Sequence, residues 1–248
     1  MIRVGVVGAA GRMGREVSRS VVADPELELV AVVDPSHAGQ VVERLTIANG
    51  LEALTDAEAE VAVEFTRPDA GPSNISWCVA NRIHVVTGTS GFDPDPAWAD
   101  QREVGVFIVP NFAIGAVLMQ RFAELAARYL PEAEIIELHH PDKPDAPSGT
   151  AMATARRMAA ARGTAPEEHV EERVPGARGA QVEGIHVHSV RLPGLVAHQA
   201  VILGGQGQTL TIRHDSSDWS SFMPGVMMAV KAVASRPGLT LGLDELLK

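Results

Sequence analysis

Only one cysteine, Cys78, occurs among the 248 residues of the chain. A single thiol excludes a disulfide within the chain and any zinc site built from cysteines. Cys78 lies in the apolar run 75–80. Free cysteines in such runs commonly behave as small hydrophobic side chains, so we expect Cys78 to be buried and not a nucleophile.

Positive charge is also scarce, with 21 Lys and Arg against 31 Asp and Glu and a formal net charge of -10. This balance would repel a phosphate backbone, so we expect no nucleic acid partner. The chain has neither a basic leader followed by an apolar stretch nor a long hydrophobic run, which predicts no signal peptide and no membrane span. A cytoplasmic protein of ordinary globular composition is the resulting expectation, with 46% hydrophobic and 21% charged residues.

Short apolar runs alternate with a helical pattern over the first hundred residues. We predict a helix at residues 11–22 and strands at residues 2–7, 27–33, 61–65, 84–87 and 104–109. Strands that are apolar on both faces and alternate with helices are typical of a parallel sheet covered on each side.

After about Pro110 the pattern changes. We predict helices at residues 115–130, 148–162 and 222–234, and strands at residues 133–140, 185–192, 197–203 and 208–213. Ser148 is suited to cap its helix and Gly163 to end it. Glycine-rich turns between the last three strands favour an antiparallel sheet, and the last helix is expected to end the ordered chain. The polar stretch 163–184 is typical of a lid or a mobile loop.

A glycine-rich turn joins the first predicted strand to the first predicted helix, and its sequence is Gly8-Ala9-Ala10-Gly11-Arg12-Met13-Gly14. Such a turn lets backbone N–H groups approach a pyrophosphate at the positive end of the helix. Asp34 ends the second strand about twenty residues later, where a carboxylate can bind a ribose 2′-OH. The pattern therefore predicts a nicotinamide dinucleotide site.

The residues around Asp34 indicate which dinucleotide is expected. A carboxylate there would repel the 2′-phosphate of NADPH unless a cation compensates, and Pro35 follows it, not Arg or Lys. Arg12 is the nearest candidate cation in the glycine turn. We therefore expect NADH to be preferred or to be used alongside NADPH.

A second polar cluster lies at residues 137–150, where two adjacent histidines are followed by a lysine and a proline-rich loop. His139 or His140 can donate a proton near neutral pH, and Lys143 carries a full positive charge. Backbone amides of Gly149 and Thr150 at a helix N-terminus would bind an anion. Each feature alone is also explained by surface polarity or capping, but together they favour an acid–base site for a carboxylate substrate.

Residues 137–151, ELHHPDKPDAPSGTA, closely resemble the signature of the dihydrodipicolinate reductases, and the resemblance extends over essentially the whole chain. The glycine turn resembles the cofactor loop of that family. Further similar segments are Phe65-Thr66-Arg67-Pro68, Gly88-Thr89-Ser90-Gly91 and Pro110-Asn111-Phe112. One departure is Trp219, which stands where family members often have arginine.

The resemblance implies an NAD(P)H-dependent oxidoreductase of diaminopimelate and lysine biosynthesis. Its small dicarboxylate substrate, 4-hydroxy-tetrahydrodipicolinate, would be reduced to tetrahydrodipicolinate with loss of water. The implied fold is an α/β Rossmann-type cofactor domain at residues 1–110 and 216–248, with an α+β substrate domain at residues 111–215. The second domain is expected to contain a mixed or antiparallel open sheet and to assemble the chain into a homotetramer.

Carried over residue by residue, the resemblance makes His139 and Lys143 the acid–base pair, and which of them gives the proton stays open. The residues expected to hold the substrate carboxylates are His140, Lys143, Ser148, Gly149 and Thr150. The residues expected to bind the cofactor are Gly8, Ala9, Ala10, Gly11, Arg12, Met13, Gly14, Asp34, Phe65, Thr66, Gly88, Thr89, Ser90, Val109, Pro110, Asn111 and Phe112.

Two other functions remain as alternatives. Another amino-acid pathway dehydrogenase would share the glycine turn but not the full cluster at residues 137–150. A non-catalytic nicotinamide sensor would keep the turn and lose that cluster. His186 and His188 alternate on one predicted strand, but no third ligand is evident, so we predict no metal site.

Overall fold

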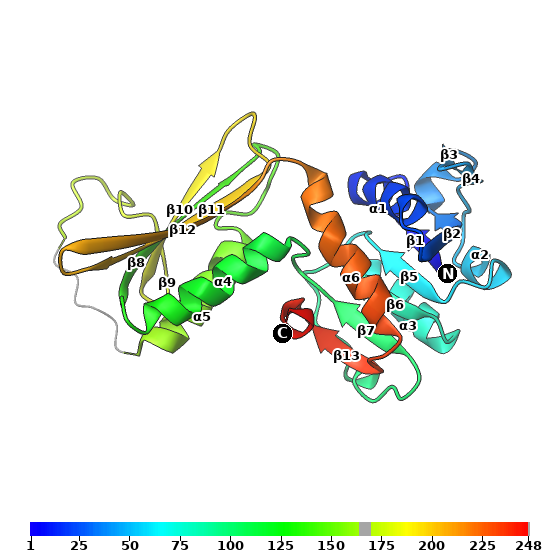
Figure 1. Cartoon of the computed structure of the whole chain (residues 1–248). Coiled ribbons are helices and arrows are strands. Elements are labelled where there is room, and N and C mark those ends of the chain that lie inside the picture. Colours follow the sequence, from blue (N-terminus) through cyan, green and yellow to red (C-terminus); the bar gives the residue numbers. More distant parts are fainter. Residues whose placement is uncertain (164–169, 248) are drawn as a thin grey trace. The chain divides into compact units, whose positions relative to one another are not determined.

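The structure is a computed structural model and describes residues 1–163 and 170–247. The chain forms two compact units, Met1–Phe112 with Phe222–Lys248 and Ala113–Ser221 (Figure 1). The domain boundaries expected from the sequence, at residues 110 and 216, lie slightly before the boundaries of these units. Part of the expected lid, residues 164–169 with His169, lies outside the described residues.

The first unit is built on a six-stranded sheet in the order β13-β7-β6-β5-β1-β2, and every pairing in it is parallel. Its strands are β1 (Ile2–Val7), β2 (Leu27–Val33), β5 (Val61–Glu64), β6 (His84–Thr87), β7 (Gly105–Ile108) and β13 (Gly238–Leu241). Every residue of β5 and β7 is buried. Continuous burial of this kind requires helices on both faces of the sheet.

Two helices, α1 (Arg12–Ala23) and α6 (Met223–Val233), contact each other and pack on the sheet. The helices α2 (Glu52–Asp56) and α3 (Gly71–Ala80), labelled in Figure 1, contribute to a core that contains Ile75, Cys78 and Trp98. A short hairpin of β3 (Val41–Val42) and β4 (Leu45–Thr46) follows β2. Single 3₁₀ turns occur at Pro35–His37, Pro96–Trp98, Trp219–Phe222 and Asp244–Leu246.

The second unit contains a five-stranded mixed sheet in the order β12-β11-β8-β10-β9. Its strands are β8 (Glu132–His139), β9 (Ala180–Val182), β10 (Ile185–Arg191), β11 (Ala197–Gly205) and β12 (Gln208–Ser216). Helices α4 (Ile114–Ala127) and α5 (Gly149–Arg162) share one hydrophobic core with three of these strands, through residues such as Met119, Met158 and Ile135. The sheet and its two helices form a layered α+β unit (Figure 1).

Three expectations about the elements are wrong. The strands β10 and β11 do not pair, because β8 lies between them and pairs parallel to β10 and antiparallel to β11. The connection from β8 to β10 contains the helix α5, and two strands joined by a helical crossover lie parallel to each other. The composition of the turns between β10, β11 and β12 did not indicate this pairing. The last helix does not end the ordered chain, because β13 follows it and extends the first sheet. The stretch expected to be a loop contains β9, paired with β10.

The predicted fold class is confirmed: a parallel α/β unit of Rossmann type and a separate α+β unit with a mixed sheet. Over the described residues, no helix has the length and apolar character that crossing a membrane requires.

Candidate functional site

The glycine turn lies between β1 and α1 and packs closely against its neighbours. Gly8 adopts a φ of 82°, in the left-handed region that favours glycine. A Cβ atom on Gly14 would lie 2.1 Å from the carbonyl oxygen of Gly8 and 2.7 Å from the Cα atom of Ala9. Because the first turn of α1 approaches the end of β1 this closely, a side chain at Gly14 would push the helix away.

Asp34 follows β2 directly and its carboxylate is held in place by the backbone. Its Oδ2 atom accepts a hydrogen bond from the Ala10 N–H at 3.2 Å, and its Oδ1 atom accepts one from the Ser36 N–H at 3.1 Å. The Nδ1 atom of His37 also lies 3.1 Å from Oδ1. The carboxylate is thereby fixed next to the glycine turn, where a ribose hydroxyl would bind.

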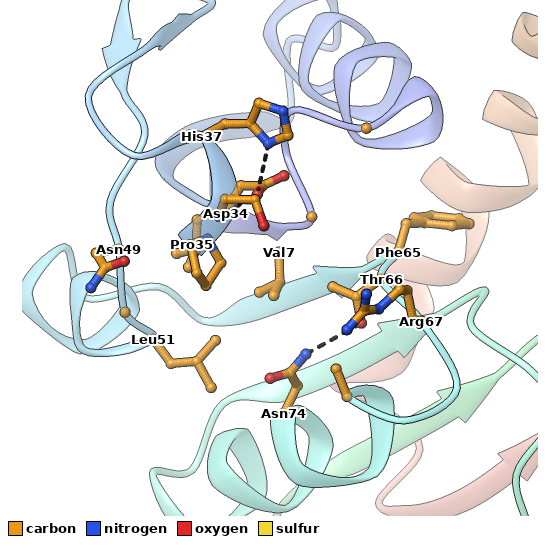
Figure 2. A pocket seen from close by; sticks show the side chains of 16 residues that line it. Val7, Asp34, Pro35, His37, Asn49, Leu51, Phe65, Thr66, Arg67 and Asn74 are labelled. Atoms are coloured by element: carbon orange, nitrogen blue, oxygen red, sulfur yellow. Dashed lines mark hydrogen bonds and ion pairs between the residues drawn. The ribbon is translucent and has the colours of Figure 1, made fainter.

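A cavity of about 480 Å³ opens beside Asp34 (Figure 2). Five of the residues predicted to bind the cofactor line it: Gly8, Gly11, Asp34, Phe65 and Thr66. Lining residues that were not predicted to bind the cofactor include His37, Asn49, Leu51 and Asn74, and Arg67 of the family-like segment also lines the cavity. A cavity of this size, next to a glycine turn and a fixed carboxylate, fits a nucleotide.

The sequence contained a signal for His37 that was not used. His37 lies one helical turn after Asp34, and Figure 2 shows the histidine ring directed at the Asp34 carboxylate. The His37 ring therefore belongs to the surroundings of the Asp34 carboxylate, for which the sequence interpretation considered only Arg12.

Two further loops predicted to bind the cofactor are joined by a buried carboxylate at the end of β5. Glu64 is only 1% exposed, and its Oε2 atom accepts a hydrogen bond from the Thr87 hydroxyl at 2.6 Å. The Thr66 hydroxyl also donates to Glu64, while the Thr66 N–H donates to the Thr89 hydroxyl at 2.9 Å. These bonds tie the loop at Phe65 and Thr66 to the loop at Gly88 and Thr89.

Aromatic packing reinforces this junction. The rings of Phe65 and Phe112 lie 5.7 Å apart, and a Cβ atom on Gly88 would lie 2.1 Å from the Phe65 ring. Val109 and Phe112 are buried. Phe65, Gly88 and Phe112 thus share one packed region at the carboxyl end of the parallel strands, where such sheets bind ligands. Ser90 and Pro110 are exposed and Asn111 is partly buried, and their cofactor role stays a prediction.

In the second unit, the polar cluster lies where β8 ends and α5 begins. The Nδ1 atom of His139 lies 2.5 Å from Oε2 of Glu137, which is completely buried. Arg191 on β10 donates to both oxygens of the same carboxylate, each at 2.9 Å. The guanidinium also donates to the Asp145 carbonyl oxygen at 2.6 Å, which connects His139 to the loop that carries Lys143.

Lys143 and His140 occupy the loop and strand end beside this network. The Nζ atom of Lys143 lies 2.7 Å from Oδ1 of Asp145, and the lysine side chain is 23% exposed. Burial opposes the ionisation of Asp145, but the hydrogen bond from Lys143 outweighs it and lowers the pKa of Asp145 below its ordinary value. The ring of His140 packs edge-on against Trp219, with ring centroids 6.1 Å apart. The departure at Trp219 therefore places an aromatic ring next to a predicted substrate residue.

The start of α5 combines a capped end with an open backbone. The Ser148 hydroxyl accepts a hydrogen bond from the Ala151 N–H at 3.2 Å, as predicted for a cap, and the Ser148 N–H donates to Glu137 at 3.3 Å. The Ser148 N–H is thereby occupied, whereas its hydroxyl hydrogen can still be donated to a ligand. At Gly149 no atom lies within 4 Å of the position that a Cβ would take. The first turn of α5 is thus accessible to an anion at Gly149.

Neither Glu137 nor Arg191 was among the site residues predicted from the sequence. A strand alternates its side chains between two faces, so a charged residue two positions before His139 was a usable signal. Arg191 lies far away in sequence and reaches Glu137 because β8 and β10 are neighbours.

The Glu137 carboxylate is ionised in the folded protein. Burial raises its pKa, but hydrogen bonds from His139, Arg191 and Ser189 outweigh that effect and bring the pKa of Glu137 from an ordinary 4.5 to about 2. Its contribution to stability is therefore complete above about pH 4.5 and is lost as the pH falls toward about 2.

This shift predicts how the replacement Glu137→Gln affects acid stability. We expect the variant to be less stable than the parent protein at neutral pH, and the difference to shrink by roughly 3 kcal/mol as the pH falls through this window. Urea unfolding of both proteins at several pH values between about 7 and about 2 measures the difference. A stability difference that does not change with pH would contradict the assignment of a lowered pKa.

Other reactive groups in the chain have structural explanations. Burial, together with the nearby Glu64, raises the pKa of the Cys78 thiol to about 12, which agrees with the expected inert cysteine. His186 contacts the Arg178 carbonyl oxygen at 2.7 Å, and His188 contacts Glu134 at 2.8 Å. No group of three or more potential metal ligands occurs within residues 1–163 and 170–247.

Comparison with known proteins identifies a family over nearly the whole chain. Two family models, described as "Dihydrodipicolinate reductase, N-terminus" and "Dihydrodipicolinate reductase, C-terminus", match residues 2–112 and 115–247. The 4-hydroxy-tetrahydrodipicolinate reductase of Nocardia farcinica is 51% identical, with 99% of this chain and 98% of the relative covered. The enzyme of the same name from Cutibacterium acnes is 49% identical, with 100% and 99% covered.

Solved structures agree with this result. A dipicolinate-bound dihydrodipicolinate reductase from Paenisporosarcina sp. TG-14 has a TM-score of 0.88 and 40% identity, with 99% of each chain covered. GenD2 from gentamicin A biosynthesis, solved in complex with NAD, has a TM-score of 0.64 at 18% identity and shares the fold alone.

Proposed function

Because the chain belongs to the dihydrodipicolinate reductase family, we propose that it catalyses the NAD(P)H-dependent reduction of 4-hydroxy-tetrahydrodipicolinate to tetrahydrodipicolinate with release of water. The reaction belongs to diaminopimelate and lysine biosynthesis. One observation carries the proposal: His139, Lys143 and the start of α5 belong to one network that runs through Glu137 and Arg191.

The two units would divide the binding tasks. The unit of Met1–Phe112 with Phe222–Lys248 would bind the dinucleotide, because it contains the glycine turn, the fixed Asp34 carboxylate and the cavity beside them. Glycines that leave no room for a Cβ atom fit the close approach of a pyrophosphate. The unit Ala113–Ser221 would bind the substrate, because it contains His139, Lys143 and the start of α5.

The side chains of the second unit suit a substrate with two carboxylates. Lys143 and the backbone at Gly149 would each bind a carboxylate, with His140 beside them. The bound reduced nicotinamide supplies the hydride. As negative charge then develops toward the ring nitrogen of the substrate, a cation near that nitrogen stabilises it and His139 or Lys143 supplies the proton.

A coupled assay tests both the reaction and the cofactor preference. Dihydrodipicolinate synthase, pyruvate and aspartate semialdehyde would generate the substrate, and the protein would be added with NADH or with NADPH. We expect loss of nicotinamide absorbance that requires the synthase, with kcat/KM for NADH at least equal to that for NADPH, because Asp34 opposes a 2′-phosphate.

Two outcomes would contradict parts of the proposal. A kcat/KM value that strongly favours NADPH would refute the argument from Asp34. Folded protein that binds NADH but gives no turnover with either cofactor would indicate a nicotinamide sensor instead of a reductase.

We also propose that the chain assembles as a homotetramer through the sheet of the second unit. Ile136, Val190 and Ile202 lie on the face of this sheet opposite to α4 and α5, and each is only partly buried. Apolar side chains on a sheet face favour association with a second copy. Cytoplasmic location stays a prediction.

A further inference from the structure

Glu137 lies between the sheet of the second unit and the start of α5. It shares a face of β8 with Ile135, a residue of the hydrophobic core, and with His139 at the strand end. Ser189 on β10 and Gln199 on β11 are its partners in strand register. A carboxylate at this position is surrounded by protein and has no exposed surface.

Donors from three different elements converge on this carboxylate. Arg191 donates Nη2–H to Oε1 and Nη1–H to Oε2, a paired arrangement that fixes the orientation of the carboxylate. The Ser148 N–H at the start of α5 donates to Oε1 at 3.3 Å. Ser189 on β10 also donates to the carboxylate, and a further contact joins Oε2 to Nδ1 of His139. The carboxylate thus connects β8, β10 and the start of α5.

The ionised state of Glu137 determines which nitrogen of His139 carries a proton. An ionised carboxylate can only accept hydrogen bonds, so Nδ1 of His139 must be the donor in the contact at 2.5 Å. A neutral His139 therefore carries its proton on Nδ1. Its Nε2 atom is then the ring nitrogen that can exchange a proton with a ligand.

We propose that Glu137 is a positioning residue for the reaction: it holds His139 with Nδ1 protonated and Nε2 available for proton exchange. The same carboxylate sets the distance between the histidine and the helix start that would bind a substrate carboxylate. The inference rests on the proposed function, since the tautomer of His139 affects the rate only if that ring exchanges a proton during the reaction.

The charged neighbours of the pair are few and can be named. Arg191 faces Glu137 from β10, and the uncharged Gln199 faces it from β11. The loop after β8 contributes Lys143 and Asp145, which pair with each other. His140 lies next to His139 in sequence and packs against Trp219. Removing the charge of Glu137 would leave Arg191 as the dominant charge beside the His139 ring, which disfavours a protonated histidine.

The chain contains a matched control for this experiment. Glu134 lies on the same strand but on the opposite face, and it contacts the same types of partner: His188 at 2.8 Å and Arg178 at 2.6 Å. Replacing either glutamate by glutamine removes one negative charge from β8 beside a histidine and an arginine. Only Glu137 contacts a histidine of the proposed site.

The experiment compares Glu137→Gln with Glu134→Gln in the coupled assay across pH. For Glu137→Gln we expect kcat to fall about 10- to 100-fold, with KM values changing about threefold or less. The limb of the kcat–pH profile that reports His139 should move to lower pH by about one unit. Glu134→Gln should retain the parent kcat and profile within about twofold. A Glu137→Gln variant with the parent kcat and pH profile would overturn the proposal.

A spectroscopic readout tests the tautomer without activity. The ring nitrogens of His139, observed by NMR in ¹⁵N-labelled protein above the pH at which the ring loses its charge, should show protonation at Nδ1 in the parent protein. In Glu137→Gln this preference should weaken. The glutamine amide has one accepting oxygen and one donating N–H₂ group, so it can no longer accept hydrogen bonds from all the donors that surround the carboxylate. Protonation at Nε2 in the parent protein would refute the proposed arrangement.

Two additional comparisons separate this role from a structural one. In a double-mutant cycle, Glu137→Gln should lower kcat much less in a His139→Gln background than in the parent protein, while independent effects would contradict the proposal. If Glu137→Gln does not fold, Glu137→Asp serves as a second variant. It retains the negative charge but shortens the side chain, so kcat should fall without a shift of the kcat–pH profile. A shift of the profile by about one pH unit in Glu137→Asp would count against the proposal. The proposed function and the proposed role of Glu137 are tested separately. Absence of turnover in the parent protein would refute the proposed function, whereas the NMR measurement tests the tautomer of His139 whether or not the protein turns over.

Discussion

Replacement of Lys143 by alanine is expected to lower kcat by about two to three orders of magnitude, while NADH binds with the same affinity. Lys143 lies on the loop between β8 and α5, and its ammonium group pairs with Asp145 at 2.7 Å. A cation at this place would stabilise negative charge that develops in the substrate, or supply the proton. Both functions disappear with the ammonium group, and neither involves the unit that contains the glycine turn.

The chain provides a direct control, since lysine occurs only at positions 143, 231 and 248. Lys231 pairs with Asp24 at 2.9 Å in the first unit, so Lys231→Ala removes an equal charge outside the proposed site. Steady-state kinetics with the coupled assay and NADH fluorescence titration measure the two effects. Lys143→Ala with full kcat would refute the assignment, and an equal loss of kcat in Lys231→Ala would attribute the effect to general charge.

The second large effect is expected at the glycine turn: Gly14→Ala should weaken NADH binding at least about 100-fold and also lower the melting temperature. The added Cβ atom would lie 2.1 Å from the Gly8 carbonyl oxygen and 2.7 Å from the Ala9 Cα atom, and all of these atoms belong to the backbone. Because backbone atoms cannot rotate away, α1 must shift from the end of β1. Overpacking of this kind costs about 1 to 3 kcal/mol and displaces the N–H groups that would face the pyrophosphate.

Gly204→Ala is a suitable control, because the nearest atom to its added Cβ, the Glu132 carbonyl oxygen, would lie at an ordinary 3.9 Å. NADH fluorescence titration measures affinity, and thermal unfolding followed by circular dichroism measures stability. Unchanged NADH affinity in Gly14→Ala would show that this turn does not bind the dinucleotide. A similar loss in Gly204→Ala would show that the effect is not local.

The sequence predicted many of the elements because local rules decide them. Ser148 and Gly163 were recognised as the cap and the stop of α5, since capping depends on a few adjacent residues. The parallel sheet was recognised because strands buried on both faces leave a continuous apolar pattern. The glycine turn was recognised for the same local reason: strand, turn and helix are consecutive in the chain.

Other features depend on neighbours that are distant in sequence. The strand β13 contains only four residues, which is too short for a clear sequence pattern. It is identified as part of the first sheet because it pairs with β7 in the folded protein. The order of the second sheet follows from the crossover through α5, not from the turns that suggested consecutive pairing. His37 was assigned no role, although the 3₁₀ turn after Asp34 brings its ring to the carboxylate.

The two-part architecture, the glycine turn with Asp34 and the cluster containing His139 and Lys143 could be predicted from the amino-acid sequence, because each is encoded in a continuous stretch of chain. The inward position of Glu137, its bonds from Arg191 and its bond from the start of α5 follow from the folded arrangement of separate segments. The reason is physical: the state of a buried carboxylate depends on every donor that surrounds it, and strand pairing brings these donors from separate parts of the chain.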